Sequence, residues 1–214
     1  SACGISMPDN DAGPLRLDQI ELPDGFTIDI YTDALPEARS LHVTESGTVF
    51  VGTRRTGTIY ALADTNGDHR ADVTHTIASG LTMPNGVAMH EGALYVAEVS
   101  RILRFDAIEA RLADPPEPVV VVDDLPEETH HGWKYIAFGP DGKLYVPVGA
   151  PCNICNPEPP FASILRMNPD GSARETVARG VRNTVGFDWH PETGVLWFTD
   201  NGRDWMGDDT PPCE

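Results

Sequence analysis

The sequence predicts an all-β protein, a β-propeller of which the chain contains about three and a half four-stranded blades. Four segments share one phrase, an apolar strand, a Gly-containing turn and a second apolar strand, which is typical of a β-hairpin. These segments are residues 41–51, 87–96, 136–146 and 185–198. Their aromatic residues follow one another at intervals of 45, 50 and 52 residues: Phe50, Tyr95, Tyr145 and Trp197. Trp189 and Trp197 are expected in the core.

Each of the first three hairpins is followed by further apolar strands. Third strands are expected at 58–61, 102–105 and 164–167, and fourth strands at 73–77, 118–122 and 175–178. Four strands that recur every ~40–50 residues are the signature of a propeller blade, whereas a β-sandwich would not repeat one phrase at this period. Because a propeller closes with at least about four blades, we expect roughly half of one. Residues 1–24 would be a leader and 25–214 a partial propeller domain.

The composition excludes several classes of protein. The 214 residues include 33 acidic and 15 basic side chains, a formal net charge of −18, so polyanions such as nucleic acid are repelled. Apolar residues make up 40% of the chain, which is enough for a buried core. Apolar runs such as Val119–Val122 are far shorter than the roughly 20 residues of a membrane-spanning helix.

The first residues leave two alternatives open. Ser1-Ala2-Cys3-Gly4 has the small-small-Cys-Gly pattern found around a bacterial lipoprotein cleavage site, which would make Cys3 a lipid anchor. An ordinary N-terminal cysteine fits these four residues equally well. Since the chain starts with Ser and ends in Pro-Pro-Cys-Glu without a closing element, we expect it to be a piece of a longer protein.

Two polar pairs occupy the same phase in neighbouring blades. His130 and His131 precede the aromatic residue of the third hairpin by 15 and 14 residues, and Arg182 and Asn183 precede that of the fourth by the same numbers. Residues just before the innermost strand of a blade line the channel mouth, so the pairs are expected to converge there. A neutral imidazole takes up a proton, and a guanidinium stabilises developing negative charge. The alternative for a single histidine is a strand cap.

Several segments carry a resemblance to a known family: residues 130–145, 180–183 and 193–202, supported by 84–88 and 94–98. In them the sequence resembles the PQQ-dependent glucose/sorbosone dehydrogenase family, the sorbosone branch more than the glucose branch. The resemblance implies a six-bladed propeller that oxidises a sugar hydroxyl or hydrated aldehyde by hydride transfer to pyrroloquinoline quinone (PQQ). It also implies a periplasmic or secreted enzyme that passes electrons to a cytochrome or another acceptor.

The same resemblance assigns roles to the polar pairs. His131 stands where the family has its general base. Arg182 stands where the family has an arginine that contacts the quinone and its reactive carbonyl. Asn85 is a weak stand-in for a glutamine of the family. The candidate cofactor contacts are therefore Asn183, His130 and Asn85.

The family also holds a Ca²⁺ on the quinone through backbone carbonyls, and here these would be the carbonyls of Gly202 and Arg203. Such a cation would polarise the quinone carbonyl as a Lewis acid. Two departures matter. Lys134 lies where glucose-type members have Gly-Arg, and the family's basic residues that bind the quinone carboxylates lie beyond residue 214.

A second candidate Ca²⁺ site is the loop of residues 64–72. Side-chain oxygens fall at positions 1, 3, 5 and 9 of this loop, a spacing that wraps a hard cation. His75 stands at position 12, where a glutamate is expected, and Gly67 stands at position 4 rather than 6. An Asp/Asn-rich turn without metal fits equally well. The candidate ligands are Asp64, Asn66, Asp68, Arg70 and Asp72.

Cys152 and Cys155 form a CxxC pattern in a Pro-rich loop. Asn156 follows instead of His, which excludes covalent c-type haem attachment, and two further zinc ligands are not evident nearby. We therefore favour a local disulfide that stiffens the loop near the channel mouth, with free thiols as the alternative.

Two other functions stay open at this stage. A Ca²⁺-dependent lactone hydrolase on a six-bladed propeller would need acidic ligands at the channel axis, where His and Arg stand instead. A non-catalytic propeller that presents loops to a partner is the other, because function is read from a site rather than from a fold.

Overall fold

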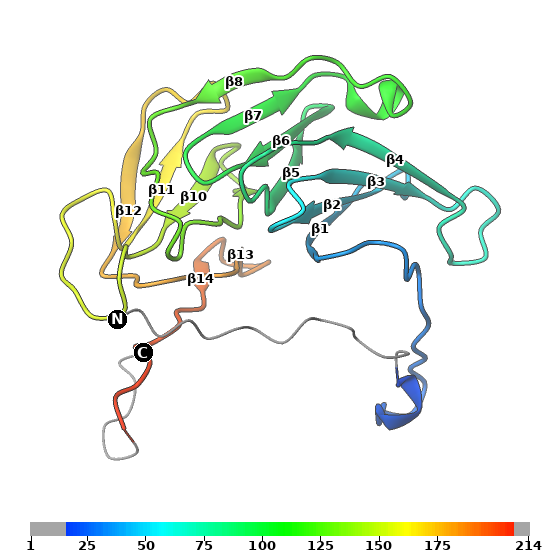
Figure 1. Cartoon of the computed structure of the whole chain (residues 1–214), viewed down its shortest axis with the longest axis horizontal. Helices are drawn as coiled ribbons and strands as arrows, with labels where there is room; N and C mark the ends of the chain where they lie inside the picture. Colours follow the sequence, from blue (N-terminus) through cyan, green and yellow to red (C-terminus); the bar gives the residue numbers. More distant parts are fainter. Residues whose placement is uncertain (1–15, 208–214) are drawn as a thin grey trace.

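A computed structural model of the chain describes residues 16–207. Within them the fold is all-β, with fourteen strands and two short 3-10 helices, η1 (Leu17–Gln19) and η2 (Ile108–Arg111). The strands form three four-stranded antiparallel sheets and one two-stranded sheet, each in chain order. The sheets follow one another around an arc, as the blades of a propeller do (Figure 1). The predicted fold class is confirmed.

We call the four sheets blades 1 to 4. Blade 1 contains β1 (Ala38–Val43), β2 (Val49–Thr53), β3 (Ile59–Ala63) and β4 (Val73–Ala78). Blade 2 contains β5 (Gly86–His90), β6 (Ala93–Ala97), β7 (Ile102–Phe105) and β8 (Val119–Val122). Blade 3 contains β9 (Ala137–Phe138), β10 (Leu144–Val148), β11 (Ser163–Met167) and β12 (Glu175–Arg179), and blade 4 contains β13 (Phe187–Trp189) and β14 (Leu196–Phe198). All the expected third and fourth strands are present.

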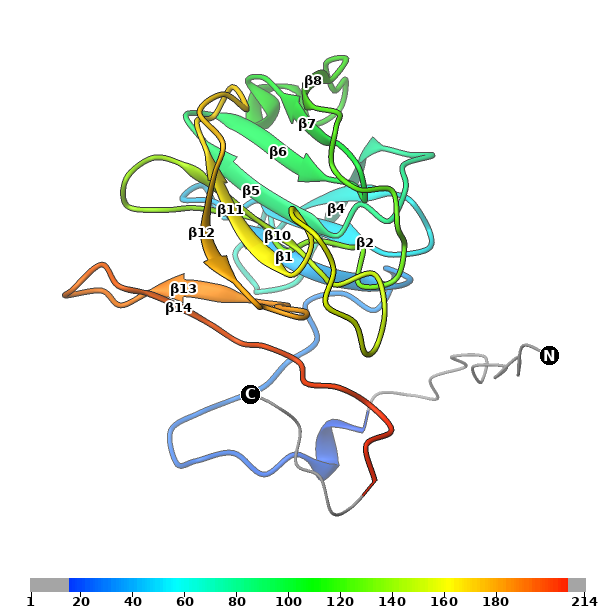
Figure 2. The ribbon, with the colours of Figure 1, turned by 90° about the vertical axis from the view of Figure 1, so that its left-hand side faces the viewer.

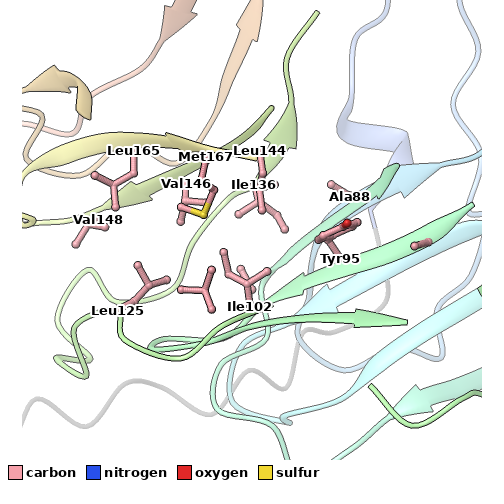
Figure 3. Close-up of a cluster of buried hydrophobic side chains, with 13 residues drawn as sticks. Ala88, Tyr95, Ile102, Leu125, Ile136, Leu144, Val146, Val148, Leu165 and Met167 are labelled. Carbon is pink, nitrogen blue, oxygen red and sulfur yellow. The ribbon is translucent and has the colours of Figure 1, made fainter. Parts of the chain in front are cut away.

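The second strand of each four-stranded blade lies in the core. Every residue of β2, β6 and β10 is buried, because neighbouring blades cover both faces of β6 and β10, while blade 2 and the segment before β1 cover β2. Between blades 2 and 3, Tyr95 and Ile102 pack with Leu144 and Met167 (Figure 3). Strand β14 of blade 4 has no such cover in the described part of the chain. Trp197 on it is 67% exposed, so the expectation that it is a core residue is wrong.

The segment before β1 approaches blade 1 from below the sheets in Figure 2. Tyr31 and Leu35 of this segment pack against a cluster formed by blade 1. The expected boundary between residues 24 and 25 stays a prediction, and Cys3 lies outside the described residues. Along residues 16–207, no helix has the length and apolar character that crossing a bilayer requires.

Blades 1 and 2 approach closely at Gly52 of β2. A Cβ atom at this position would overlap the backbone carbonyl of Asn85, so only glycine fits. Gly186 offers a matched control, because a Cβ there would meet nothing within 4 Å.

We expect Gly52→Ala to lower the free energy of unfolding of the full-length protein by about 3 kcal/mol, since backbone on both sides must move apart. Gly186→Ala should change it by less than about 0.5 kcal/mol. Denaturant unfolding of the two variants beside the wild type tests the contact. Equal stability of both variants would contradict this packing of blade 1 on blade 2.

Candidate active site

The segments that carry His131 and Arg182 meet at Gly149 and Ala150, directly after β10. A Cβ atom on Gly149 would lie 2.6 Å from the Cβ of His131 and 3.4 Å from the backbone oxygen of Arg182. The Ala150 N–H donates to that same Arg182 oxygen at 2.7 Å. Because Gly149 has no side chain, the two segments can flank one dipeptide. The two sequence-predicted catalytic residues therefore come from neighbouring blades to one place.

The contacts of His131 fix its tautomer. Its Nδ1 lies 2.8 Å from the backbone oxygen of Ala150. A carbonyl oxygen only accepts hydrogen bonds, so Nδ1 carries the proton and Nε2 keeps its lone pair. Burial lowers the pKa of His131 below its usual value near 6.5; the bond to Ala150 opposes this shift, and the charges of His130 and Arg182 add to it. The imidazole is therefore neutral at pH 7, with a basic Nε2.

The backbone of His131 is also constrained. Its φ angle is 52°, in the left-handed region that residues with a side chain adopt at a cost. The adjacent His130 ring lies edge-on to the His131 ring, with 4.0 Å between the centroids. His131 is thus held from both sides, by His130 and by the Ala150 carbonyl, which keeps its orientation defined.

Arg182 ties two loops together. Its Nε donates to the Asn153 backbone oxygen at 3.1 Å, and its Nη2 donates to the Asn153 side-chain oxygen at 2.7 Å. Further bonds run from Nη1 to the Asn201 backbone oxygen and from Nη2 to Asp204. These bonds use four of the five N–H groups of the guanidinium. Most N–H donors of the Arg182 guanidinium therefore hold the two loops, a role that the sequence did not predict.

A disulfide joins Cys152 to Cys155 in the first of these loops, and Asn153 lies inside the ring that it closes. The second loop, residues 201–204, contains the predicted Ca²⁺-holding carbonyls. Gly202 and Arg203 are both partly buried there, and Arg203 lines a pocket of about 410 Å³ together with Arg182 and Asp200. The predicted Ca²⁺ position thus adjoins Arg182.

Asp200 positions the Arg182–Asn183 segment. Its two carboxylate oxygens accept the backbone N–H groups of Arg182 at 3.0 Å and Asn183 at 2.7 Å. Asn183 itself is buried. In blade 2, Glu98 occupies the same phase and accepts the Thr82 N–H at 2.7 Å. The signal for Asp200 is present in the sequence, since both acids follow their blade's aromatic residue by three positions, but we did not predict its role.

Asn85 lines a second pocket, separate from the one beside Arg182. Its Nδ2 donates to the Lys134 backbone oxygen at 2.8 Å, and its Oδ1 accepts from the Ser40 hydroxyl at 3.1 Å. Asn85 and Ser40 line a pocket of about 320 Å³ that also contains Trp133. The structure places Asn85 as a strut between blades 1, 2 and 3, and its assignment as a cofactor contact stays a prediction.

Lys134 is buried without a carboxylate partner among residues 16–207. Its Nζ donates to the backbone oxygens of Val99 and Gly132, the latter at 2.8 Å. Burial lowers the pKa of Lys134 from 10.5 to about 8. This lysine links blade 2 to the residue that follows His131.

The oxygens of the 64–72 loop are used within the loop. Asp64 accepts the backbone N–H groups of Gly67 and His69 at 2.7 and 2.9 Å, and Asp72 accepts from Thr65 and Asn66. In residues 16–207, no group of three or more His, Cys, Asp and Glu side chains is arranged to hold a metal ion. The geometry matches the Asp/Asn-rich turn of the sequence analysis, and the Ca²⁺ site stays a prediction.

Comparison with known proteins gives the family. A family model described as a domain of unknown function, DUF7133, matches residues 17–209. The chain belongs to this family. An uncharacterized protein of Borreliella burgdorferi is 28% identical to this DUF7133 chain over 206 residues, which are 91% of the chain and 52% of that protein. The chain thus spans about half the length of this curated relative.

Solved structures share the fold of the DUF7133 chain. The PQQ-bound aldose sugar dehydrogenase of Streptomyces coelicolor is 21% identical, with TM-score 0.67 over 83% of this chain and 60% of that one. A family AA12 carbohydrate-active enzyme of Trichoderma reesei is 20% identical, with TM-score 0.72 over 85% and 50%. The calcium-binding protein regucalcin of Agrobacterium tumefaciens is 17% identical, with TM-score 0.58 over 80% and 55%. At these identities the resemblance seen in the sequence is confirmed for the fold alone.

We expect the buried Lys134 to make stability depend on pH. Its folded pKa of about 8 lies below the 10.5 of the unfolded chain, so the unfolded state binds more protons between these values and stability rises with pH there. Relative to Lys134→Met, the wild type should gain up to about 3 kcal/mol of unfolding free energy across this interval. Lys143→Met, which removes a less buried charge, is the control. A difference between wild type and Lys134→Met that does not change with pH would contradict the burial of a charged amine.

We expect Asp200→Asn to release the backbone that it holds. The side-chain amide of the new Asn has only one oxygen, so its NH₂ group faces one of the two backbone N–H groups and cannot accept from it. Hydrogen exchange of the Arg182 and Asn183 backbone amides with solvent should therefore accelerate by roughly 10- to 100-fold. Glu98→Gln should accelerate exchange at Thr82 and leave Arg182 and Asn183 unchanged. Hydrogen exchange resolved by residue measures both. Unchanged protection in Asp200→Asn would remove its positioning role.

Proposed function

We propose that this DUF7133 chain contributes to an oxidoreductase that removes hydride from a sugar hydroxyl or hydrated aldehyde, with PQQ as the cofactor. The observation that carries the proposal is the geometry of His131. Its Nδ1–H is held by Ala150, which leaves Nε2 as a neutral base beside a cation from the next blade. A base next to a positive charge suits removal of a hydroxyl proton from a carbon that loses hydride.

Two donors on the segment of Arg182 and Asn183 suit the carbonyl oxygens of a quinone. Asn183 offers a buried side-chain amide, and Arg182 keeps one N–H beyond its four loop contacts. The backbone carbonyls of Gly202 and Arg203 are hard oxygen ligands of the kind that Ca²⁺ takes. When bound, the quinone supplies a two-electron acceptor.

In this proposal each residue of the site has a separate role. His131 takes the substrate hydroxyl proton at Nε2, and Ala150 keeps the ring oriented. Asp200 holds the backbone of Arg182 and Asn183, so that both side chains are fixed before a ligand arrives. Because four of its N–H groups are already used, Arg182 acts on a ligand mainly through its charge.

The chain spans only part of its relatives, so substrate, acceptor and location belong to the same proposal. We infer a small sugar or aldehyde substrate, a cytochrome or another electron acceptor, and a periplasmic or secreted location. The disulfide of Cys152 and Cys155 supports an oxidising compartment. Anchoring through Cys3 is part of this expectation.

The two alternatives have less support. A Ca²⁺-dependent lactonase needs grouped acidic ligands, and the described residues contain no group of three or more such side chains arranged for a metal. A non-catalytic propeller gives no reason for a histidine held in a left-handed conformation with its basic nitrogen unused.

The test is dye reduction by the full-length protein loaded with PQQ and Ca²⁺, with aldoses and sorbosone as substrates. We expect His131→Gln to lower kcat by about 10²- to 10⁴-fold, the usual contribution of a general base. His190→Gln, an exposed histidine in the turn of blade 4, should leave kcat unchanged. Turnover without PQQ, or a His131→Gln variant as active as wild type, would refute the proposal.

The same assay carries a pH prediction. A base must be deprotonated to act, so kcat/KM falls when the pH drops through the His131 pKa. Because burial lowers that pKa, half-maximal activity is expected below pH 6.5. If kcat/KM instead reaches half its maximum at pH 6.5 or above, a group other than His131 titrates.

A further inference from the structure

Two arginines of blade 1 lack the carboxylate partners that most arginines of this chain have. Within residues 16–207, eight arginines form ion pairs with Asp or Glu, and neither Arg39 nor Arg54 is among them. The chain has 33 acidic and only 15 basic residues, so carboxylates are abundant. A shortage of acidic residues therefore does not explain why Arg39 and Arg54 form no ion pair.

Both arginines face the same aromatic ring. Arg39 lies in β1 and Arg54 directly follows β2, strands that pair so that Ala38 stands opposite Thr53. Their guanidinium carbons lie 5.3 and 3.8 Å from the ring centroid of Trp133, which comes from the segment before blade 3. Trp133 thus gathers two cations from blade 1.

This arrangement leaves hydrogen-bond donors unused. A ring face attracts a cation but accepts little from its N–H groups. The Nε of Arg54 is buried and has no hydrogen-bond partner. Burial, and then the neighbouring charges of Arg55 and Arg39, lower the pKa of Arg54, while the more weakly acting charge of Glu37 opposes this shift. Two like charges side by side repel one another, so an anion between them would be favourable.

An opening adjoins the pair. Arg39 and Trp133 line the pocket of about 320 Å³ described above, together with Ser40, Asn85, Tyr135 and Val185. These residues come from segments at the start of all four blades, so the pocket lies where the blades converge. Its lining has no residue in common with the 410 Å³ pocket beside Arg182.

We propose that Arg39, which lines this pocket, binds the carboxylate of a small organic acid there, and that Arg54, stacked on the other cation's partner ring Trp133, adds a second positive charge beside it. Guanidinium groups recognise carboxylates through paired charge-assisted hydrogen bonds, and the pocket volume accommodates a molecule of the size of a sugar acid. The inference stands apart from the proposed redox chemistry, because it concerns binding. The carboxylate can come from a substrate or from a carboxylated cofactor such as PQQ, and the experiment separates the two.

The experiment is calorimetric titration of the full-length protein with three probes: D-glucuronate, D-glucose and PQQ. If the substrate carries the carboxylate, glucuronate binds at least about 10-fold more tightly than glucose. Arg39→Gln and Arg54→Gln then weaken glucuronate binding by about 10- to 100-fold and leave glucose binding unchanged. Arg111→Gln, which removes an equal charge from the exposed end of η2, should alter neither. Thermal melts of all variants check the fold.

Other titration results would show that the bound carboxylate belongs to the cofactor. In that case PQQ affinity falls in Arg39→Gln and Arg54→Gln, and glucuronate shows no advantage over glucose. The proposal is overturned if neither probe's affinity depends on Arg39 or Arg54. If the variants do not fold, the wild type alone decides by salt dependence, since binding of glucuronate and PQQ that does not weaken with added NaCl overturns it as well. Failure of the redox assay with intact acid binding would leave this inference standing.

Discussion

The backbone of Gly149 and Ala150 is the contact on which the candidate site depends. The Ala150 carbonyl sets the tautomer of His131, and the Ala150 N–H holds the backbone of Arg182. Gly149 leaves the room that lets both segments approach. A base and a cation from two blades are therefore organised by main-chain groups at the end of one buried strand, without any direct bond between their side chains.

The blades share one strand arrangement, and they differ in the residue that stands three positions after the aromatic residue of the second strand. The second strands of blades 1 to 3 are buried on both faces, but the residue at the end of the second strand differs from blade to blade. Glu98 and Asp200 reach back to the backbone before their blades' innermost strands, while Thr53 and Val148 occupy the same phase in blades 1 and 3. The repeated strands thus present a different side chain at each equivalent position. Residues that form the core are therefore distinct from the residues that hold the loops.

The strands were predictable from the sequence because the apolar periodicity that defines them also buries them. The approach of His131 and Arg182 was predictable for the same reason, since equal phase in adjacent blades means adjacent positions. The acceptors of Arg182 were not, because Asn153 and Asp204 lie in irregular loops that no periodicity describes. Trp197 was misjudged because burial of a blade face depends on the neighbouring blade, a long-range property that a local pattern does not contain.

The small ring closed by Cys152 and Cys155 has a consequence for handling the protein. Asn153 sits inside that ring and supplies two of the four acceptors of Arg182. A thiol reductant would open the ring and free the backbone of Asn153. In preparations kept in dithiothreitol, the guanidinium of Arg182 would then be held less firmly. The structure of the site therefore depends on whether a sample has been exposed to reductant.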